Sequence, residues 1–125
     1  MSLARLAGIA GATAAALAVA CGAFGAHALR NHLDADALAT WRIAVDYQFW
    51  HALALVLVAA LARMPNRALR FAAFAFIAGI VLFCASLYAL ALGAPRALGM
   101  LTPVGGVAFI VGWITLALGC RGAAR

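Results

Sequence analysis

The sequence predicts an all-α integral membrane protein, a four-helix bundle of up-down-up-down topology, on two observations. The 125 residues are 69% hydrophobic and only 10% charged, whereas average soluble domains are roughly 45–50% apolar and about 25% charged. Four separate stretches are also long and apolar enough to cross a hydrocarbon layer of about 30 Å. So few charged side chains cannot cover a soluble domain of this size, and the length allows one membrane domain over residues 1–125.

The predicted spans are residues 6–29, 43–62, 71–94 and 100–120. The connections between them are short, so consecutive helices are expected to run antiparallel. The first stretch begins like a signal peptide, with Arg5 before the apolar run and Cys21 after a cleavage-like sequence. Because the run continues to Leu29, it is too long for a signal-peptide core, and a retained helix is favoured.

The first connection carries a helical pattern of its own. Leu33, Ala37 and Trp41 recur every four residues, so they share one face of a helix. Asn31, followed three residues later by Asp34, resembles a helix-capping arrangement. The pattern predicts a short amphipathic helix that lies in the membrane interface, with Trp41 as its anchor.

Small residues indicate where the helices meet, because lipid tails give helices no hydrophobic reason to associate. Stripes of them run along three spans, namely Ala14, Ala18, Gly22 and Ala26; Ala72, Gly79, Ser86 and Gly93; and Gly105, Ala108, Gly112, Thr115 and Gly119. The predicted packing glycines are Gly22, Gly25, Gly79, Gly105, Gly106, Gly112 and Gly119. At the start of the fourth span, Thr102 can cap the helix and Pro103 suits its first turn.

The charge pattern predicts orientation. All nine basic residues are arginines, and with three aspartates they give a net charge of +6. They stand singly between apolar runs, so nucleic-acid binding is not expected. One side of the membrane has Arg5, Arg63, Arg67, Arg70, Arg121 and Arg125, and the other has only Arg30, Arg42 and Arg96. The positive-inside rule therefore places both termini in the cytoplasm.

Polar side chains inside a membrane are costly, so each one in a span is a candidate for function. At 1.5 Å per residue, His51 lies about 13 Å deeper than Arg42, and Ser86 lies about 12 Å deeper than Ala94. The polar side chains are thus expected to converge in the outer half of the bundle. This candidate polar site comprises His27, Asp46, Tyr47, Gln48, His51, Ser86, Tyr88 and Thr102.

Two interpretations of this cluster stay open. One is a hydrogen-bonded network that fixes helix packing, with about 0.6 kcal/mol per bond in membrane proteins. The other is a polar pocket that binds a solute or relays protons, with His51 as the titrating group. Asp46 has a simpler expected role, because Arg42 lies four residues before it on the same helical face and suits an ion pair.

No motif supports an enzyme class. The sequence contains no nucleophile elbow, no phosphate loop and no dinucleotide fingerprint. No pair of histidines or cysteines has a recognised metal-ligand spacing. We therefore expect no catalytic residue, no metal site and no cofactor.

Five short motifs occur in order along the chain, at residues 22–27 (GAFGAH), 47–51 (YQFWH), 83–88 (FCASLY), 102–106 (TPVGG) and 112–113 (GW). In this order and spacing the chain resembles a family of small bacterial inner-membrane proteins, domain of unknown function 423, whose eukaryotic relatives resemble transmembrane protein 256. The resemblance covers essentially the whole chain. It implies four spans in the inner membrane, and it points to no particular biochemical activity because the function of the family is unknown.

The sequence leaves two classes of function open. The small-residue faces favour a non-enzymatic accessory or organising membrane protein, whose partners are membrane lipids and either further copies of itself or another membrane protein. The alternative is a small solute or proton transporter or channel that uses the polar cluster around His51. One carboxylate and one imidazole at mid-depth are few groups for a coupled pump, which usually has chains of them.

Overall fold

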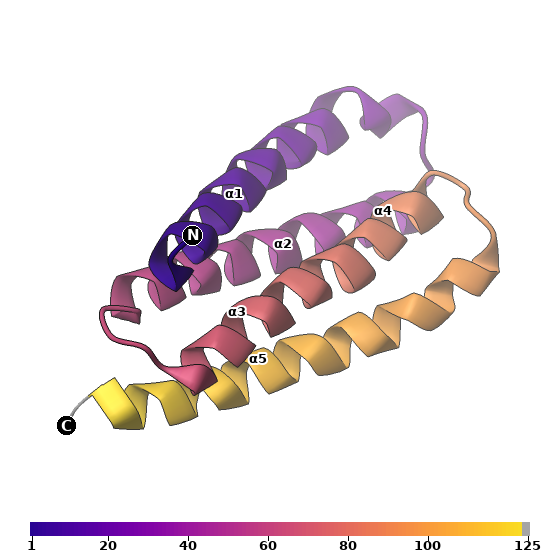
Figure 1. Ribbon diagram of the computed structural model, residues 1–125. Helices are drawn as coiled ribbons and strands as arrows, with labels where there is room; N and C mark the ends of the chain where they lie inside the picture. Colours follow the sequence, from indigo (N-terminus) through magenta and orange to yellow (C-terminus); the bar gives the residue numbers. More distant parts are fainter. Residues whose placement is uncertain (124–125) are drawn as a thin grey trace.

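The computed structural model describes residues 1–123 and is helical throughout that range, apart from short connections. The elements are α1 (Leu3–His27), η1 (Leu29–Asn31), α2 (Ala35–Leu61), α3 (Arg67–Gly79), η2 (Ile80–Cys84), α4 (Ala85–Ala91), η3 (Arg96–Met100) and α5 (Leu101–Ala123). Elements α3, η2 and α4 form one continuous helical rod, the third of four. The others are α1, α2 and α5, and consecutive rods run in opposite directions (Figure 1). All four are long and apolar enough to cross a membrane. The predicted fold class is confirmed.

The third rod and α2 form the centre of the molecule. Helix α1 packs mainly on α2, and α5 packs mainly on α3 and η2. Figure 1 shows α1 and α5 on opposite sides of this central pair. Each outer helix therefore leaves a broad face for lipid or for a partner.

The first connection differs from the prediction, because α2 begins at Ala35 and not at residue 43. The Asp34 carboxylate caps this helix by accepting a hydrogen bond from the Ala37 amide at 2.8 Å. Residues 35–41 are thus the first turns of α2, and the expected interfacial helix and the cap at Asn31 are both wrong. The four-residue repeat marks the packing face of α2, since Trp41 is only 5% exposed.

A single π-helical turn, Ile80–Cys84, interrupts the third rod. The amide of Ala85 donates to the carbonyl of Ile80, five residues earlier. Such a turn inserts one extra residue and changes the face that the following residues present. Ser86 and Tyr88 follow it, and both bond to neighbouring helices. No residue pattern in the sequence predicts this turn.

The glycine heptad of the fourth span lies on the face of α5 that packs against α3 and η2. Large residues recur every seven positions along the third rod. Glycines recur every seven positions along α5, which runs in the opposite direction. The two antiparallel helices therefore fit in register, with small residues opposite large ones. The pairs are Gly119 with Leu69, Gly112 with Phe76, Gly105 with Phe83 and, with the roles reversed, Gly79 with Phe109.

The face that α1 presents to α2 is rotated from the predicted stripe. Ala26 is exposed, and Ala14 and Gly22 are half-buried. Gly25 admits the indole of Trp41, because a Cβ there would lie 2.6 Å from the ring. The buried positions of α1 are Ala7, Gly11, Ala18 and Gly25.

Two other glycines make no close helix contact. Gly93 of the third stripe lies beyond the end of α4, and its φ of 94° is a conformation that favours glycine. Gly106 is half-buried, but a Cβ there would stay 3.8 Å from the ring of Phe83. Gly106 was predicted as a packing glycine, and the structure gives it ordinary van der Waals space instead.

Candidate functional site

Gln48 connects three helices inside the protein. Its side chain is 6% exposed. The Nε2 amide donates to the carbonyl oxygen of Ala14 on α1 at 2.8 Å, and Oε1 accepts from the Tyr88 hydroxyl on α4 at 2.8 Å. Both ends of the amide are thus used in bonds between helices, each of which contributes about 0.6 kcal/mol in membrane proteins.

His51 is 5% exposed, and both ring nitrogens have partners. Nδ1 lies 2.6 Å from the carbonyl oxygen of Tyr47. Because a carbonyl only accepts, Nδ1 carries the proton. The unprotonated Nε2 then accepts from the indole N–H of Trp113 on α5 at 3.2 Å. The imidazole also stacks on Phe109, with ring centroids 3.5 Å apart.

Ser86 and Thr102 form a second bonded pair between the third rod and α5. Ser86 Oγ donates to the carbonyl of Phe83 at 2.9 Å and lies 2.6 Å from Thr102 Oγ1. Since Ser86 has a single hydroxyl proton, Thr102 is the donor in the second bond. Thr102 therefore does not cap α5 as expected; it lies inside that helix, and its hydroxyl is used across the interface.

Aromatic rings fill the space between these polar groups. The Tyr47 ring stacks on Phe83, with centroids 4.6 Å apart, and lies 5.8 Å from the imidazole of His51. Phe76 meets Trp113 edge-on at 5.2 Å. Tyr47 thus joins the cluster through its ring and its backbone carbonyl.

Trp41 lies in the interior of the protein and not on its lipid-facing surface. Its indole N–H donates to the carbonyl of Cys21 on α1 at 2.8 Å. Its ring meets Tyr88 edge-on, with centroids 4.6 Å apart. Trp41 therefore packs on the same tyrosine that bonds to Gln48, and it extends the network toward the end of α1.

Two predicted members of the cluster lie outside it. His27 is exposed at the end of α1. Asp46 is exposed on α2, in a shallow groove shared with α1. Arg42 is exposed as well, and the structure of residues 1–123 contains no salt bridge between Arg42 and Asp46. Helical spacing puts the two side chains on one face of α2, but Asp46 lines the groove against α1 and Arg42 does not.

The network is fully paired within the described residues. Every buried side-chain nitrogen and oxygen atom of residues 1–123 has a hydrogen-bond partner. The same range contains no group of three or more His, Cys, Asp or Glu side chains that could hold a metal ion. Because the polar groups are directed at one another, the arrangement specifies one packing of the four rods.

Comparison with known proteins places the chain in a family. Residues 21–106 match the family described as Protein of unknown function (DUF423). The chain belongs to the DUF423 family. Its four rods are apolar and long enough to cross a membrane, and its relatives are named membrane proteins. This DUF423 protein is therefore an integral membrane protein.

Several relatives of this DUF423 protein come from bacteria. It is 43% identical over 111 residues to a UPF0382 membrane protein of Staphylococcus saprophyticus, covering 89% of this chain and 92% of that protein. It is 44% identical to the UPF0382 membrane protein YwdK of Bacillus subtilis, covering 86% and 89%. A UPF0382 membrane protein of Haemophilus influenzae is 43% identical, covering 81% and 82%. No solved structure gives a significant match.

Two partners in the network of this DUF423 protein were not predicted from the sequence. Trp113 was recognised only as part of a motif, yet it donates to His51. An indole N–H within an apolar span needs an acceptor, and that requirement is the signal that could have found it. The carbonyl of Ala14 offered no signal, because every helical residue carries one.

Proposed function

We propose that this DUF423 protein is a non-enzymatic accessory protein of the bacterial inner membrane that assembles with another membrane protein. Asp46 carries the proposal. It is exposed on the same side of α2 as Ile43, Trp50 and Leu53, which are 45%, 53% and 50% exposed. At 1.5 Å per residue it lies about 16 Å along the helix from Ala35, so a 30 Å hydrocarbon layer centred on α2 contains it.

A carboxylate that faces lipid is costly. Asp at the centre of a span costs about 2.5–3.5 kcal/mol on insertion scales. Intramembrane charges therefore usually face protein or a hydrated cavity. A partner helix that presents a hydrogen-bond donor or a cation to Asp46 would remove this cost.

The surface around Asp46 has room for such a helix. A groove of about 440 Å³ runs between α1 and α2. Small residues of α1 on one side permit close approach of another backbone. Its lining residues are Ala18, Val19, Gly22, Ala23, Val45, Asp46, Phe49 and Trp50.

A different protein suits this groove better than a second copy. A two-fold dimer uses the same patch on both subunits. Such a dimer would bring the two Asp46 carboxylates close together, and like charges repel strongly where the dielectric constant is low. The proposed partner is therefore a transmembrane helix with a Lys, an Arg or an uncharged donor at this depth.

The internal network supports an accessory role over transport. Gln48, His51 and Ser86 are bonded to neighbouring helices or to their own backbone. A solute site or a proton relay needs groups that are free to bind or to exchange protons. We accordingly assign no transport and no catalytic role to these residues.

Site-specific photo-crosslinking in native membranes tests the proposed assembly. A photoreactive residue at Phe49 lies in the groove, and one at Val107, on an exposed face of α5, is the matched control. We expect position 49 alone to give an adduct of defined mass with one distinct membrane protein. The adduct should be lost in Asp46→Leu and kept in Asp36→Asn. Adducts only between copies of this chain, or an adduct that survives Asp46→Leu, would contradict the proposal.

We also propose that both termini face the cytoplasm. The end of the molecule where α1 begins carries Arg5, Arg63, Arg67 and Arg70, while Arg125 lies outside the described residues. The opposite end carries only Arg30, Arg42 and Arg96. By the positive-inside rule, this excess of arginine at the end where α1 begins supports a cytoplasmic position for both termini. Alkaline phosphatase fused after Arg125 should be inactive, and a fusion after Arg96 should be active. The reverse pattern would overturn the orientation.

A further inference from the structure

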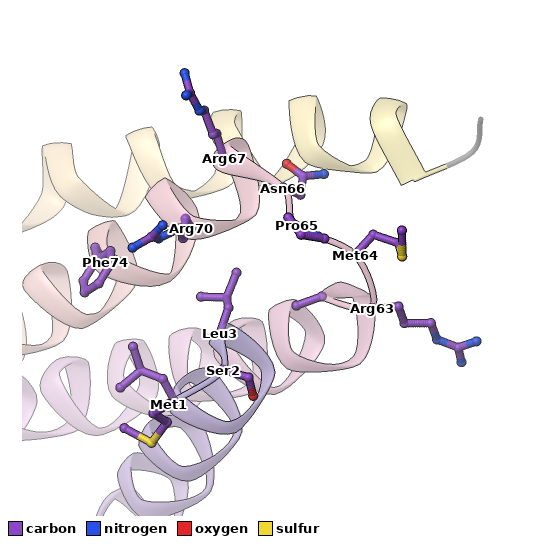
Figure 2. A pocket seen from close by; sticks show the side chains of 12 residues that line it. Met1, Ser2, Leu3, Arg63, Met64, Pro65, Asn66, Arg67, Arg70 and Phe74 are labelled. Atoms are coloured by element: carbon purple, nitrogen blue, oxygen red, sulfur yellow. The ribbon is translucent and has the colours of Figure 1, made fainter.

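A hollow of about 770 Å³ opens at the end of the molecule where α1 begins and α2 ends (Figure 2). Its wall comes from the start of α1, the connection after α2 and the first turns of α3. The side chains that matter for its chemistry are Leu3, Arg63, Asn66, Arg67, Arg70 and Phe74. The hollow therefore lies at the ends of spans, where lipid headgroups meet a membrane protein.

A second hollow, of about 330 Å³, adjoins the first. It is lined by Arg67, Arg70, Phe71 and Phe74, three of which also line the first hollow. Phe71 and Phe74 are 67% and 53% exposed, so this hollow opens sideways from α3. A recess bordered by arginines at the ends of the spans is thus continuous with an apolar groove beside α3.

The walls carry positive charge without compensation from acidic side chains. Arg63, Arg67 and Arg70 are all exposed. None of the acidic residues of the sequence lines either hollow, since these are Asp34, Asp36 and Asp46. An anionic group is therefore the complementary ligand at this end of the molecule.

Local geometry adds to this preference. Helices α1 and α3 both begin here, capped by Ser2 and Asn66, and helix N-termini carry partial positive charge. Figure 2 shows the Arg70 side chain lying beside Phe74, while Arg63 and Arg67 extend outward from the rim. Arg67 and Arg70 both line the apolar groove.

We infer that the two hollows form a binding site for one anionic phospholipid. The phosphate group lies at Arg67 and Arg70, and an acyl chain lies against Phe71 and Phe74. Arginine binds phosphate oxygens in pairs through its planar guanidinium group. Basic pockets between membrane helices at this depth hold the headgroups of anionic lipids. The site is separate from the groove at Asp46 and does not depend on the proposed assembly.

Lipid-dependent stabilisation of the full chain in mild detergent tests this inference. Phosphatidylglycerol should raise the melting temperature, and phosphatidylcholine with the same acyl chains should not. Native mass spectrometry should show one retained phosphatidylglycerol per chain. The variant R63Q/R67Q/R70Q should lose both effects, whereas R30Q/R42Q/R96Q, which removes the three exposed arginines of the opposite end, should keep them.

Inorganic phosphate distinguishes a phospholipid from a free anion. It should give less than half of the shift seen with phosphatidylglycerol, because it cannot use the groove at Phe71 and Phe74. A full shift with phosphate alone, an equal shift with phosphatidylcholine or an equal loss in both triple variants would overturn the inference.

Charge-preserving variants keep the test decisive if R63Q/R67Q/R70Q does not fold. R63K/R67K/R70K retains the charge but loses paired hydrogen bonding to phosphate. It should bind phosphatidylglycerol about tenfold more weakly than the unmodified protein, which corresponds to about 1.4 kcal/mol. Unchanged affinity in this variant, relative to R30K/R42K/R96K, would overturn the assignment of the phosphate to these arginines.

Discussion

Gly105 on α5 lies directly against the backbone of Phe83, inside the π-helical turn of the third rod. A Cβ on Gly105 would collide with the amide nitrogen of Phe83. A backbone atom cannot move aside as the end of a flexible side chain can. At the adjacent Gly106, a Cβ would remain 3.8 Å from the nearest atom of Phe83. These two neighbouring glycines therefore differ in whether packing requires them.

The first prediction concerns this pair. Gly105→Ala should destabilise the protein by about 1–3 kcal/mol, which is typical of overpacking. Gly106→Ala should be neutral or stabilising by up to about 1 kcal/mol, because alanine favours a helix over glycine. Unfolding midpoints in detergent measure both effects. Equal destabilisation by the two changes would show that α5 does not approach the π-helical turn as described.

The second prediction concerns the bond between Gln48 and Tyr88. A double-mutant cycle with Gln48→Leu and Tyr88→Phe should give a coupling free energy of about 0.6 kcal/mol, and at most about 1.7 kcal/mol. Tyr47→Phe is the control, because within residues 1–123 its hydroxyl makes no hydrogen bond. A coupling of zero would mean that the two side chains do not bond in the membrane.

The third prediction concerns the tautomer of His51. Nitrogen NMR of the labelled imidazole should show the proton on Nδ1, which donates to the Tyr47 carbonyl, and an unprotonated Nε2. Trp113→Phe removes the donor to Nε2 and should shift the Nε2 resonance. Trp50→Phe, at a 53% exposed position, should leave it unchanged. A proton found on Nε2 would contradict the network.

The fourth prediction separates packing from transport. Purified protein in liposomes should conduct protons no faster than empty liposomes, because the polar groups around His51 are engaged with one another. His51→Ala should change the unfolding midpoint without changing the flux. A measurable flux that this variant abolishes would restore the transporter hypothesis.

The fold and the candidate site were predictable to different degrees. The glycines at 105, 112 and 119 could be recognised because a seven-residue repeat marks one helix face, whatever lies opposite. The repeat at Leu33, Ala37 and Trp41 was ambiguous, since it fits a separate helix and the first turns of a longer one equally well. Only the cap at Asp34 distinguishes these possibilities, and it became visible only in the structure.

The sequence by itself determined the number of spans, their alternating direction and the uneven distribution of arginine between the two ends. Each span must be long and apolar enough to cross the hydrocarbon layer, so it can be recognised without its neighbours. Only the tertiary structure decided which polar groups meet. That outcome depends on how each helix is rotated, and the π-helical turn at Ile80–Cys84 alters the rotation in a way that no residue pattern records. The tertiary structure also showed that His27 and Asp46 lie outside the network. Depth along a helix does not determine the direction in which a side chain points.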